Sequence, residues 1–295
     1  MSSVPVPTEK LRNQPHAIVD ELELAHGAAR SFRTVWLRCG RCPERCVFCD
    51  LPSYGEAEPL GPERARAQLE TALPPGQALP WGLKLYNGSS FFEPRSIEPA
   101  AQELLLERAA RCERIVVESR PEFGAQALAA ARRWPDRLEV ALGLEVADDG
   151  WLHRLGKRTT AGAYFATAAE LSRAGIAVRA FVLLGLPGLD PAAALELCLQ
   201  TLEACAERGI GSVSILPTAA TTQALRRAQA RGDFAPPAMT SVFAAARRAL
   251  DLGLLTRIDL SFHFAPLGCD RCRAVCQALN QSGALPELSC PCVEF

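Results

Sequence analysis

No stretch of this 295-residue chain approaches the ~18 consecutive apolar residues that a membrane-spanning helix needs. The N-terminus also lacks the basic-then-apolar order of a secretory signal peptide, so we expect a cytoplasmic protein whose thiols stay reduced. The net charge is −1, which leaves no protein-wide field that would attract polyanions. Any binding of nucleic acid must therefore come from a local patch of the surface.

Histidine is scarce as well. The chain has four histidines, and none shows the paired spacing or the neighbouring acid of a catalytic dyad. The N-terminal thirty residues show no repeat or low-complexity character. With 48% hydrophobic and 22% charged residues, the composition is that of a soluble globular protein. A chain of this length accommodates either one large α/β unit or two ordinary domains.

Cysteine, by contrast, is abundant, and four of the 12 cysteines fall within one short segment: Cys39, Cys42, Cys46 and Cys49. In a reduced protein, such a concentration of thiols indicates a metal site rather than disulfides. The two Cys-x-x-Cys knuckles of a zinc ribbon stand ~15–20 residues apart, whereas here only residues 43–45 separate them. The bacterial ferredoxin run also differs, because its spacing is x2, x2, x3 and its proline follows the fourth cysteine. The segment therefore predicts an iron site.

A second group of cysteines stands near the end of the chain: Cys269, Cys272, Cys276, Cys290 and Cys292. A Cys-x2-Cys pair with a distal Cys-x-Cys pair can close around one tetrahedral ion or one cluster. We predict a second metal site here, occupied either by zinc as a structural clasp or by a second iron–sulfur cluster. The remaining cysteines, Cys112, Cys198 and Cys205, stand alone on predicted helices and are interpreted as core residues.

Apolar β-rich runs alternate with helical patterns along the chain, as in the βαβ units of a parallel sheet. Strands are predicted at 32–37, 82–86, 114–117, 138–144, 177–184, 211–216 and 257–262, and helices at 61–73, 99–110, 124–134, 161–174, 191–208 and 239–252. Right-handed crossovers and short loops then favour an α/β fold, a partial (β/α)6 TIM-like barrel. We expect an N-terminal helical arm at 1–30, the barrel at 31–260 and a cysteine-rich C-terminal extension at 261–295.

Ligands of such sheets bind beyond the carboxyl ends of the strands. The second predicted strand is followed by the small residues 87–90, which either let the backbone approach a ligand or form a simple Asn-Gly turn. Glu118 and Arg120 follow the third strand, as ligands or as a surface ion pair, and Glu145 ends the fourth. Arg179, in the fifth strand, is either an inward-facing ligand contact or a structural arginine.

The run Cys42-x3-Cys46-x2-Cys49, with Phe48 just before the last cysteine, resembles the cluster motif of the radical S-adenosylmethionine (SAM) superfamily. The resemblance implies that three thiolates hold a [4Fe–4S] cluster, that the open iron binds SAM, and that SAM is cleaved to a 5′-deoxyadenosyl radical that abstracts hydrogen from a substrate. It also implies a partial barrel and an electron donor of the flavodoxin or ferredoxin type. With Cys39 as a fourth ligand, the chain would instead be a non-enzymatic electron carrier or an iron–sulfur or zinc binding protein.

The same resemblance assigns contacts with SAM to residues of four loops: Phe48, Asn87, Gly88, Ser89, Ser90, Glu118, Arg120 and Glu145. The strings Leu-Tyr-Asn-Gly-Ser-Ser-Phe-Phe-Glu-Pro-Arg, Val-Glu-Ser-Arg-Pro-Glu-Phe and Gly-Leu-Glu are further similar to the branch that contains the archaeosine-synthase radical SAM subunit and, more distantly, the elongator catalytic subunit. That branch implies a modified base in tRNA as substrate. Arg271 and Arg273, beside the tail cysteines, are the first candidates for phosphate contacts; the alternatives are that they tune a cluster or are simply solvated. A small metabolite or a peptide is the alternative, because shared cofactor motifs do not determine the substrate.

Overall fold

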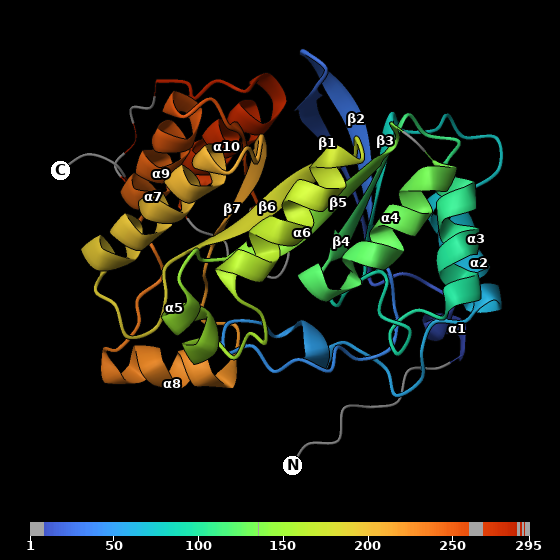
Figure 1. The fold of residues 1–295 in the computed structure, drawn as a ribbon, viewed down its shortest axis with the longest axis horizontal. Coiled ribbons are helices and arrows are strands. Elements are labelled where there is room, and N and C mark those ends of the chain that lie inside the picture. Colours follow the sequence, from blue (N-terminus) through green and yellow to red (C-terminus); the bar gives the residue numbers. More distant parts are fainter. Residues whose placement is uncertain (1–8, 135, 260–267, 288–289, 291, 293–295) are drawn as a thin grey trace.

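The structure is a computed structural model, and it describes residues 9–134, 136–259, 268–287, 290 and 292. Within these ranges eight strands form one sheet in the order β1 to β8. The pair β1–β2 is antiparallel, and all later pairs are parallel. Figure 1 shows the sheet curled, with most of the helices along its outer side and α5 and α8 at one end of the strands. None of the described helices is both long and apolar enough to cross a membrane.

The strands are β1 (Ala17–Ala25), β2 (Ala28–Trp36), β3 (Gly82–Tyr86), β4 (Arg114–Ser119), β5 (Leu138–Glu145), β6 (Ala177–Leu184), β7 (Ser212–Pro217) and β8 (Leu255–Ile258). The helices are α1 (Glu9–Arg12), α2 (Pro62–Ala72), α3 (Pro99–Ala109), α4 (Gly124–Arg133), α5 (Asp149–Arg154), α6 (Ala161–Arg173), α7 (Pro191–Glu207), α8 (Gln223–Arg231), α9 (Met239–Asp251) and α10 (Asp270–Ser282), with short 3-10 turns η1 (Leu51–Ser53) and η2 (Pro121–Phe123). The predicted α/β partial barrel is confirmed, because parallel strands alternate with helices from β2 to β8.

Burial and capping explain why these segments form strands and helices, including α8, which the sequence analysis did not predict. Every residue of β3 and β5 is buried, as expected for parallel strands that are covered on both faces. The helices α6, α7 and α8 are preceded by the N-cap residues Thr160, Asp190 and Thr222, and the side chain of each accepts a hydrogen bond from a backbone N–H in the first turn. The residues 260–262 of the last predicted strand lie outside the described part of the chain.

The helical arm predicted at the N-terminus is wrong for most of its described residues. Only Glu9–Arg12 is helical, whereas β1 pairs with β2 along its full length. His26 and Gly27 connect the two strands with φ values of 50° and 73°, the positive values that a two-residue hairpin turn of type I′ requires. The Ala, Leu and Glu residues of β1 favour a helix locally, but strand pairing overrides that preference.

Charged side chains meet inside the barrel, on the half nearer the amino ends of the parallel strands. Glu23 of β1 forms ion pairs with Lys84 of β3, with Arg179 of β6 at 3.4 Å and with Arg257 of β8 at 2.7 Å. Arg179 also pairs with Glu139 of β5 at 2.6 Å. The Arg179 side chain is 1% exposed, so it points inward and its partners are glutamates, which identifies it as a structural arginine.

The two edges of the sheet approach each other across this charged group. The guanidinium of Arg257 on β8 donates a hydrogen bond to the backbone oxygen of Leu24 on β1 at 3.1 Å. Helix α10 packs against β1, β2 and β8, and the amide of Asn280 makes two 2.9 Å hydrogen bonds with the backbone of Ile258. Thus α10 covers the gap between the first and last strands.

Candidate functional site

A cavity opens at the carboxyl ends of the parallel strands, where the sequence predicted the ligand-binding loops. The predicted residues that line it are Cys42, Cys46, Phe48, Cys49, Gly88, Ser89, Glu118, Arg120 and Glu145. Asn87 and Ser90 are buried behind the cavity wall, where the Asn87 amide donates to the Ser90 oxygen at 3.3 Å. The structure therefore brings the predicted loops to one place, with two of their residues serving as support.

The cysteine loop between β2 and η1 is fixed by contacts with distant parts of the chain. The backbone N–H of Val47 donates to the oxygen of Leu155 at 2.9 Å. The hydroxyl of Thr222, which also caps α8, donates to the oxygen of Val47 at 2.8 Å. Phe48 packs against residues that follow β5 and end β6 and β7. The loop is therefore held between the segments that follow β5 and β7.

Cys39 is directed away from the three other cysteines of this segment. Its thiol donates to the backbone oxygen of Asn87 at 3.0 Å and lies 3.1 Å from the hydroxyl of Ser96. Burial raises the pKa of the Cys39 thiol to about 12, although these hydrogen bonds oppose the rise. Cys39 does not line the cavity, so the geometry offers three cysteines there rather than four.

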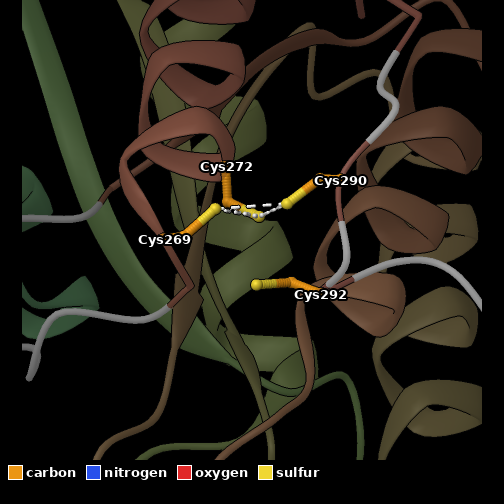
Figure 2. Close-up of side chains that lie close together, drawn as sticks. All are labelled: Cys269, Cys272, Cys290 and Cys292. Carbon is orange, nitrogen blue, oxygen red and sulfur yellow. Dashed lines mark hydrogen bonds between the residues drawn. The ribbon is translucent and has the colours of Figure 1, made fainter.

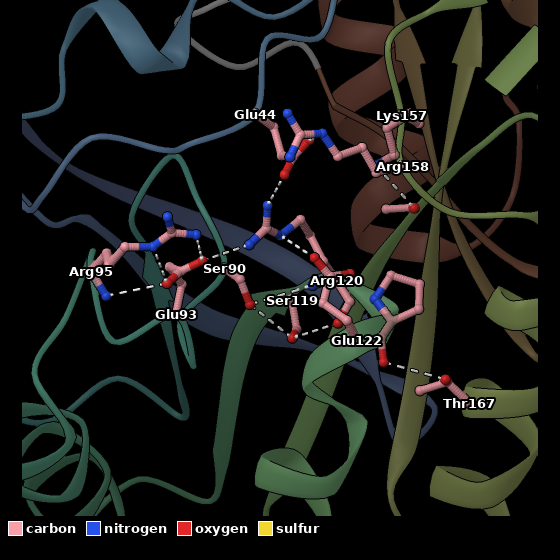
Figure 3. Close-up of polar contacts among 12 residues, drawn as sticks. Glu44, Ser90, Glu93, Arg95, Ser119, Arg120, Glu122, Lys157, Arg158 and Thr167 are labelled. Carbon is pink, nitrogen blue, oxygen red and sulfur yellow. Dashed lines mark hydrogen bonds and ion pairs between the residues drawn. The ribbon is translucent and has the colours of Figure 1, made fainter. Parts of the chain in front are cut away.

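Arg120 connects the cysteine loop to strand β4 (Figure 3). Its guanidinium forms ion pairs with Glu44 at 3.0 Å, Glu93 at 2.8 Å and Glu122 at 3.0 Å. Glu44 lies between Cys42 and Cys46 and also faces Arg158 at 3.5 Å. The contact of Arg120 with SAM stays a prediction. What the structure shows is that Arg120 orients the cysteine loop through Glu44, a residue that the sequence analysis missed.

Glu118 holds the loop that follows β3. One oxygen of its carboxylate accepts the backbone N–H groups of Asn87 and Gly88, each at 2.6 Å. Burial raises the pKa of Glu118 to about 7, and the N–H donors limit the rise. Gly88 has a φ of 65°, which a residue without a side chain adopts at no steric cost. Ser89, in the same loop, lines the cavity, and its buried hydroxyl has no hydrogen-bond partner among the described residues.

A buried ion pair also lines the cavity near the cysteines. Lys157 lies 3.0 Å from the carboxylate of Glu145, and both line the cavity. Burial alone would lower the pKa of Lys157, but Glu145 and Cys46 raise it above its usual value, so the amine stays charged. Glu145 has a φ of 68°, an uncommon value for a residue with a side chain and one that concentrates at functional sites. Lys157 is a further cavity residue that the sequence analysis missed.

Four of the five tail cysteines come together at a separate place (Figure 2). The sulfur atoms of Cys269, Cys272, Cys290 and Cys292 all lie within 4.8 Å of one another, and no other group of three or more metal-ligating side chains in the described ranges is so compact. Cys276, predicted as a fifth ligand, lies outside this group and is buried in the hydrophobic core. The interpretation of Cys112, Cys198 and Cys205 as core residues is confirmed.

Comparison of the whole chain with known proteins gives matches in structure only. No protein-family model matches the chain, and no curated protein sequence matches it. A radical SAM methyltransferase from Sphaerobacter thermophilus superposes with a TM-score of 0.55 at 17% identity, covering 86% of this chain and 75% of that one. Methylornithine synthase gives 0.52 at 15% identity, covering 80% and 75%. A queuine lyase from Clostridium spiroforme, bound to SAM and queuine, gives 0.51 at 15% identity, covering 68% and 80%. The chain is therefore similar in fold to radical SAM enzymes.

Proposed function

We propose that this chain is a radical SAM enzyme that binds a [4Fe–4S] cluster through Cys42, Cys46 and Cys49. When bound, such a cluster supplies the electron that cleaves SAM to methionine and a 5′-deoxyadenosyl radical, which abstracts hydrogen from the substrate. The observation that carries the proposal is the arrangement of the cysteines. Cys42, Cys46 and Cys49 line a cavity at the carboxyl ends of the strands, in a fold similar to that of radical SAM enzymes. The thiol of Cys39 is instead hydrogen-bonded to the backbone of Asn87.

The residues around the three cysteines are suited to a bound [4Fe–4S] cluster. Burial raises the pKa of Cys46 to about 11, and the nearby Lys157 opposes the rise. Thiolates bound to iron are anionic, so a charged amine beside them stabilises the bound form. The three sulfur atoms also lack the compact spacing of the tail group, as expected where each thiolate binds a different iron. Three protein ligands leave one coordination position for the cofactor.

The other cavity residues have roles that follow from their contacts. The unpartnered hydroxyl of Ser89 and the carboxylate of Glu145, which Lys157 orients, are polar groups that can bind the polar ends of SAM. Phe48 packs across the ends of β6 and β7 and excludes water from that wall. Glu118 and Arg120 act as positioning residues for two loops. We propose that the electron comes from a flavodoxin- or ferredoxin-type protein.

The proposal is tested with protein reconstituted anaerobically with iron and sulfide. Addition of SAM is expected to change the electron paramagnetic resonance signal of the reduced protein, because SAM would bind the iron that lacks a protein ligand. Reduction with dithionite in the presence of SAM is expected to yield 5′-deoxyadenosine and methionine. A signal that SAM leaves unchanged, with no 5′-deoxyadenosine formed, would support the electron-carrier alternative instead.

For the substrate we propose a modified base in tRNA. Support comes from the sequence resemblance to the archaeosine and elongator branch and from the queuine lyase neighbour, which was solved with queuine bound. Arg158 lines the cavity and its side chain is 81% exposed, so it can reach a phosphate. Of the two arginines predicted for this role, Arg271 is exposed, whereas Arg273 pairs with Asp270 and donates to the Gly268 oxygen at 3.0 Å.

We expect modest binding of bulk tRNA that weakens steeply with salt, because each phosphate contact releases counterions. Arg158→Ala is expected to weaken binding and to lower the slope of log affinity against log salt by about 1. A filter-binding titration at several salt concentrations measures both. Arg133→Ala, on the outer face of α4, is the matched control and should change neither. Undetectable binding at low salt would exclude tRNA and favour a small metabolite or a peptide.

A further inference from the structure

The four tail thiols lie at distances from one another that match ligands of a single ion. Zinc–sulfur bonds of ~2.3 Å place neighbouring sulfurs of a tetrahedron about 3.8 Å apart. The sulfur of Cys269 lies 3.1 Å from that of Cys290 and 3.8 Å from that of Cys272, and the Cys272 and Cys290 sulfurs lie 3.6 Å apart. The Cys292 sulfur is within 4.8 Å of the other three.

An iron–sulfur cluster requires a wider arrangement. In a [4Fe–4S] cluster each thiolate binds a different iron, and in a [2Fe–2S] cluster the thiolates divide into two pairs on separate irons. The loop cysteines Cys42, Cys46 and Cys49 of the same chain do not form a compact group of this kind. The geometry therefore points to one zinc ion bound by Cys269, Cys272, Cys290 and Cys292. Zinc is favoured over ferrous iron because a tetrahedral four-sulfur site suits zinc and binds it more tightly.

The position of the ligands gives this ion a structural role. Cys269 and Cys272 lie at the start of α10, whereas Cys290 and Cys292 come from the chain that follows the helix. Cys272 and Cys290 are buried in the main hydrophobic core. Four protein ligands leave no open position for a substrate. The ion would therefore join the start of α10, the helix that covers the gap between β1 and β8, to the chain segment that follows this helix.

The first test is metal analysis of a variant in which Cys42, Cys46 and Cys49 are all alanine. About one zinc per chain and no acid-labile sulfide are expected. This variant lacks the proposed SAM-cleaving site, so the result does not depend on the function proposed above. Iron with sulfide in this variant, or folded protein without metal, would overturn the inference.

The second test compares two further cysteine changes in the same variant. Cys292→Ser removes an exposed thiol, so the core is not disturbed, and it is expected to weaken zinc binding at least tenfold in a competition titration with a chromophoric chelator. Cys276→Ala changes a buried thiol one turn beyond Cys272 and is expected to retain about one zinc per chain. Loss of zinc from Cys276→Ala together with its retention in Cys292→Ser would overturn the ligand set.

Cobalt provides a readout of geometry. Exchange of the zinc in the triple alanine variant for Co²⁺ is expected to give the intense visible absorption of a tetrahedral site and a sulfur-to-cobalt charge-transfer band in the near ultraviolet. Cys276→Ala should leave this spectrum unchanged, and Cys292→Ser should alter it. The weak visible absorption of six-coordinate cobalt would contradict a site of four thiolates.

Discussion

Cys46→Ala is expected to reduce the cleavage of SAM by the dithionite-reduced protein to background. With this thiolate removed, two cysteines remain at the cavity, and two ligands do not retain a cluster in a form that can bind SAM. The measurement is 5′-deoxyadenosine formed per chain after anaerobic reconstitution, together with the iron and sulfide content of the same sample.

Cys39→Ala is the matched control, because Cys39 belongs to the same segment but does not line the cavity. Its thiol forms hydrogen bonds with the Asn87 oxygen and the Ser96 hydroxyl instead. It is expected to retain its iron and most of its SAM cleavage. Loss of the cluster from Cys39→Ala would identify Cys39 as a fourth ligand. Cleavage of SAM by Cys46→Ala at the wild-type rate would show that the loop has been misassigned.

Glu23→Gln is expected to lower the free energy of unfolding at pH 7 by about 3–5 kcal/mol, the usual cost of removing one partner from a buried ion pair. Glu23 is buried, and its carboxylate faces Lys84, Arg179 and Arg257. Without this charge, Arg179 would retain its pair with Glu139 and Lys84 its pair with the partly exposed Glu21, whereas Arg257 would lose its carboxylate partner. Urea unfolding measures the change. Asp20 lies on β1 like Glu23, but its carboxylate is exposed and pairs with Arg33 of β2, so Asp20→Asn should cost less than about 1 kcal/mol.

Glu23→Gln is also expected to change how the free energy of unfolding depends on pH. Burial alone would raise the pKa of Glu23, but the three cations lower it well below its usual range. A group with a lowered pKa in the folded state stabilises the protein fully above its unfolded pKa of roughly 4.5, and this stabilisation is lost as the pH falls below that value. The wild type should therefore lose more stability than Glu23→Gln between pH 6 and pH 3. If the free energy of unfolding fell by the same amount in both proteins across this range, the role assigned to Glu23 would be contradicted.

Most of the barrel could be predicted from the sequence because its strands and helices have strong local patterns. Residues 177–184 form β6 as predicted, and the six predicted helices between the strands appear within about two residues of their expected bounds. The hairpin of β1 and β2 could not be predicted in this way. Its first strand carries residues that favour a helix, and only pairing with β2 and the contacts of Glu23 inside the barrel select the strand.

The sequence predicted those parts of the candidate site that a short local motif contains. The spacing of Cys42, Cys46 and Cys49 identified the loop, but spacing alone could not show that Cys39 turns away. The ion pair of Glu44 with Arg120 joins loops far apart in the sequence, and no local pattern reports it. In the tail, the count of cysteines predicted a metal, but whether one ion or a cluster fits depends on distances that only the fold supplies.

The contact between Arg257 and the backbone of Leu24 has a consequence for synthesis of the chain on the ribosome. The two residues are 233 positions apart, so β1 emerges long before its partner on β8 exists. At the usual elongation rates of ~5–20 residues per second, the delay is roughly 10 to 50 s. Lys84 and Arg179 are also made after Glu23, and Arg257 comes last, so Glu23 lacks at least one of its three cationic partners throughout this delay and β1 cannot reach its final environment. The hairpin that is made first is therefore among the last parts of the barrel to be completed.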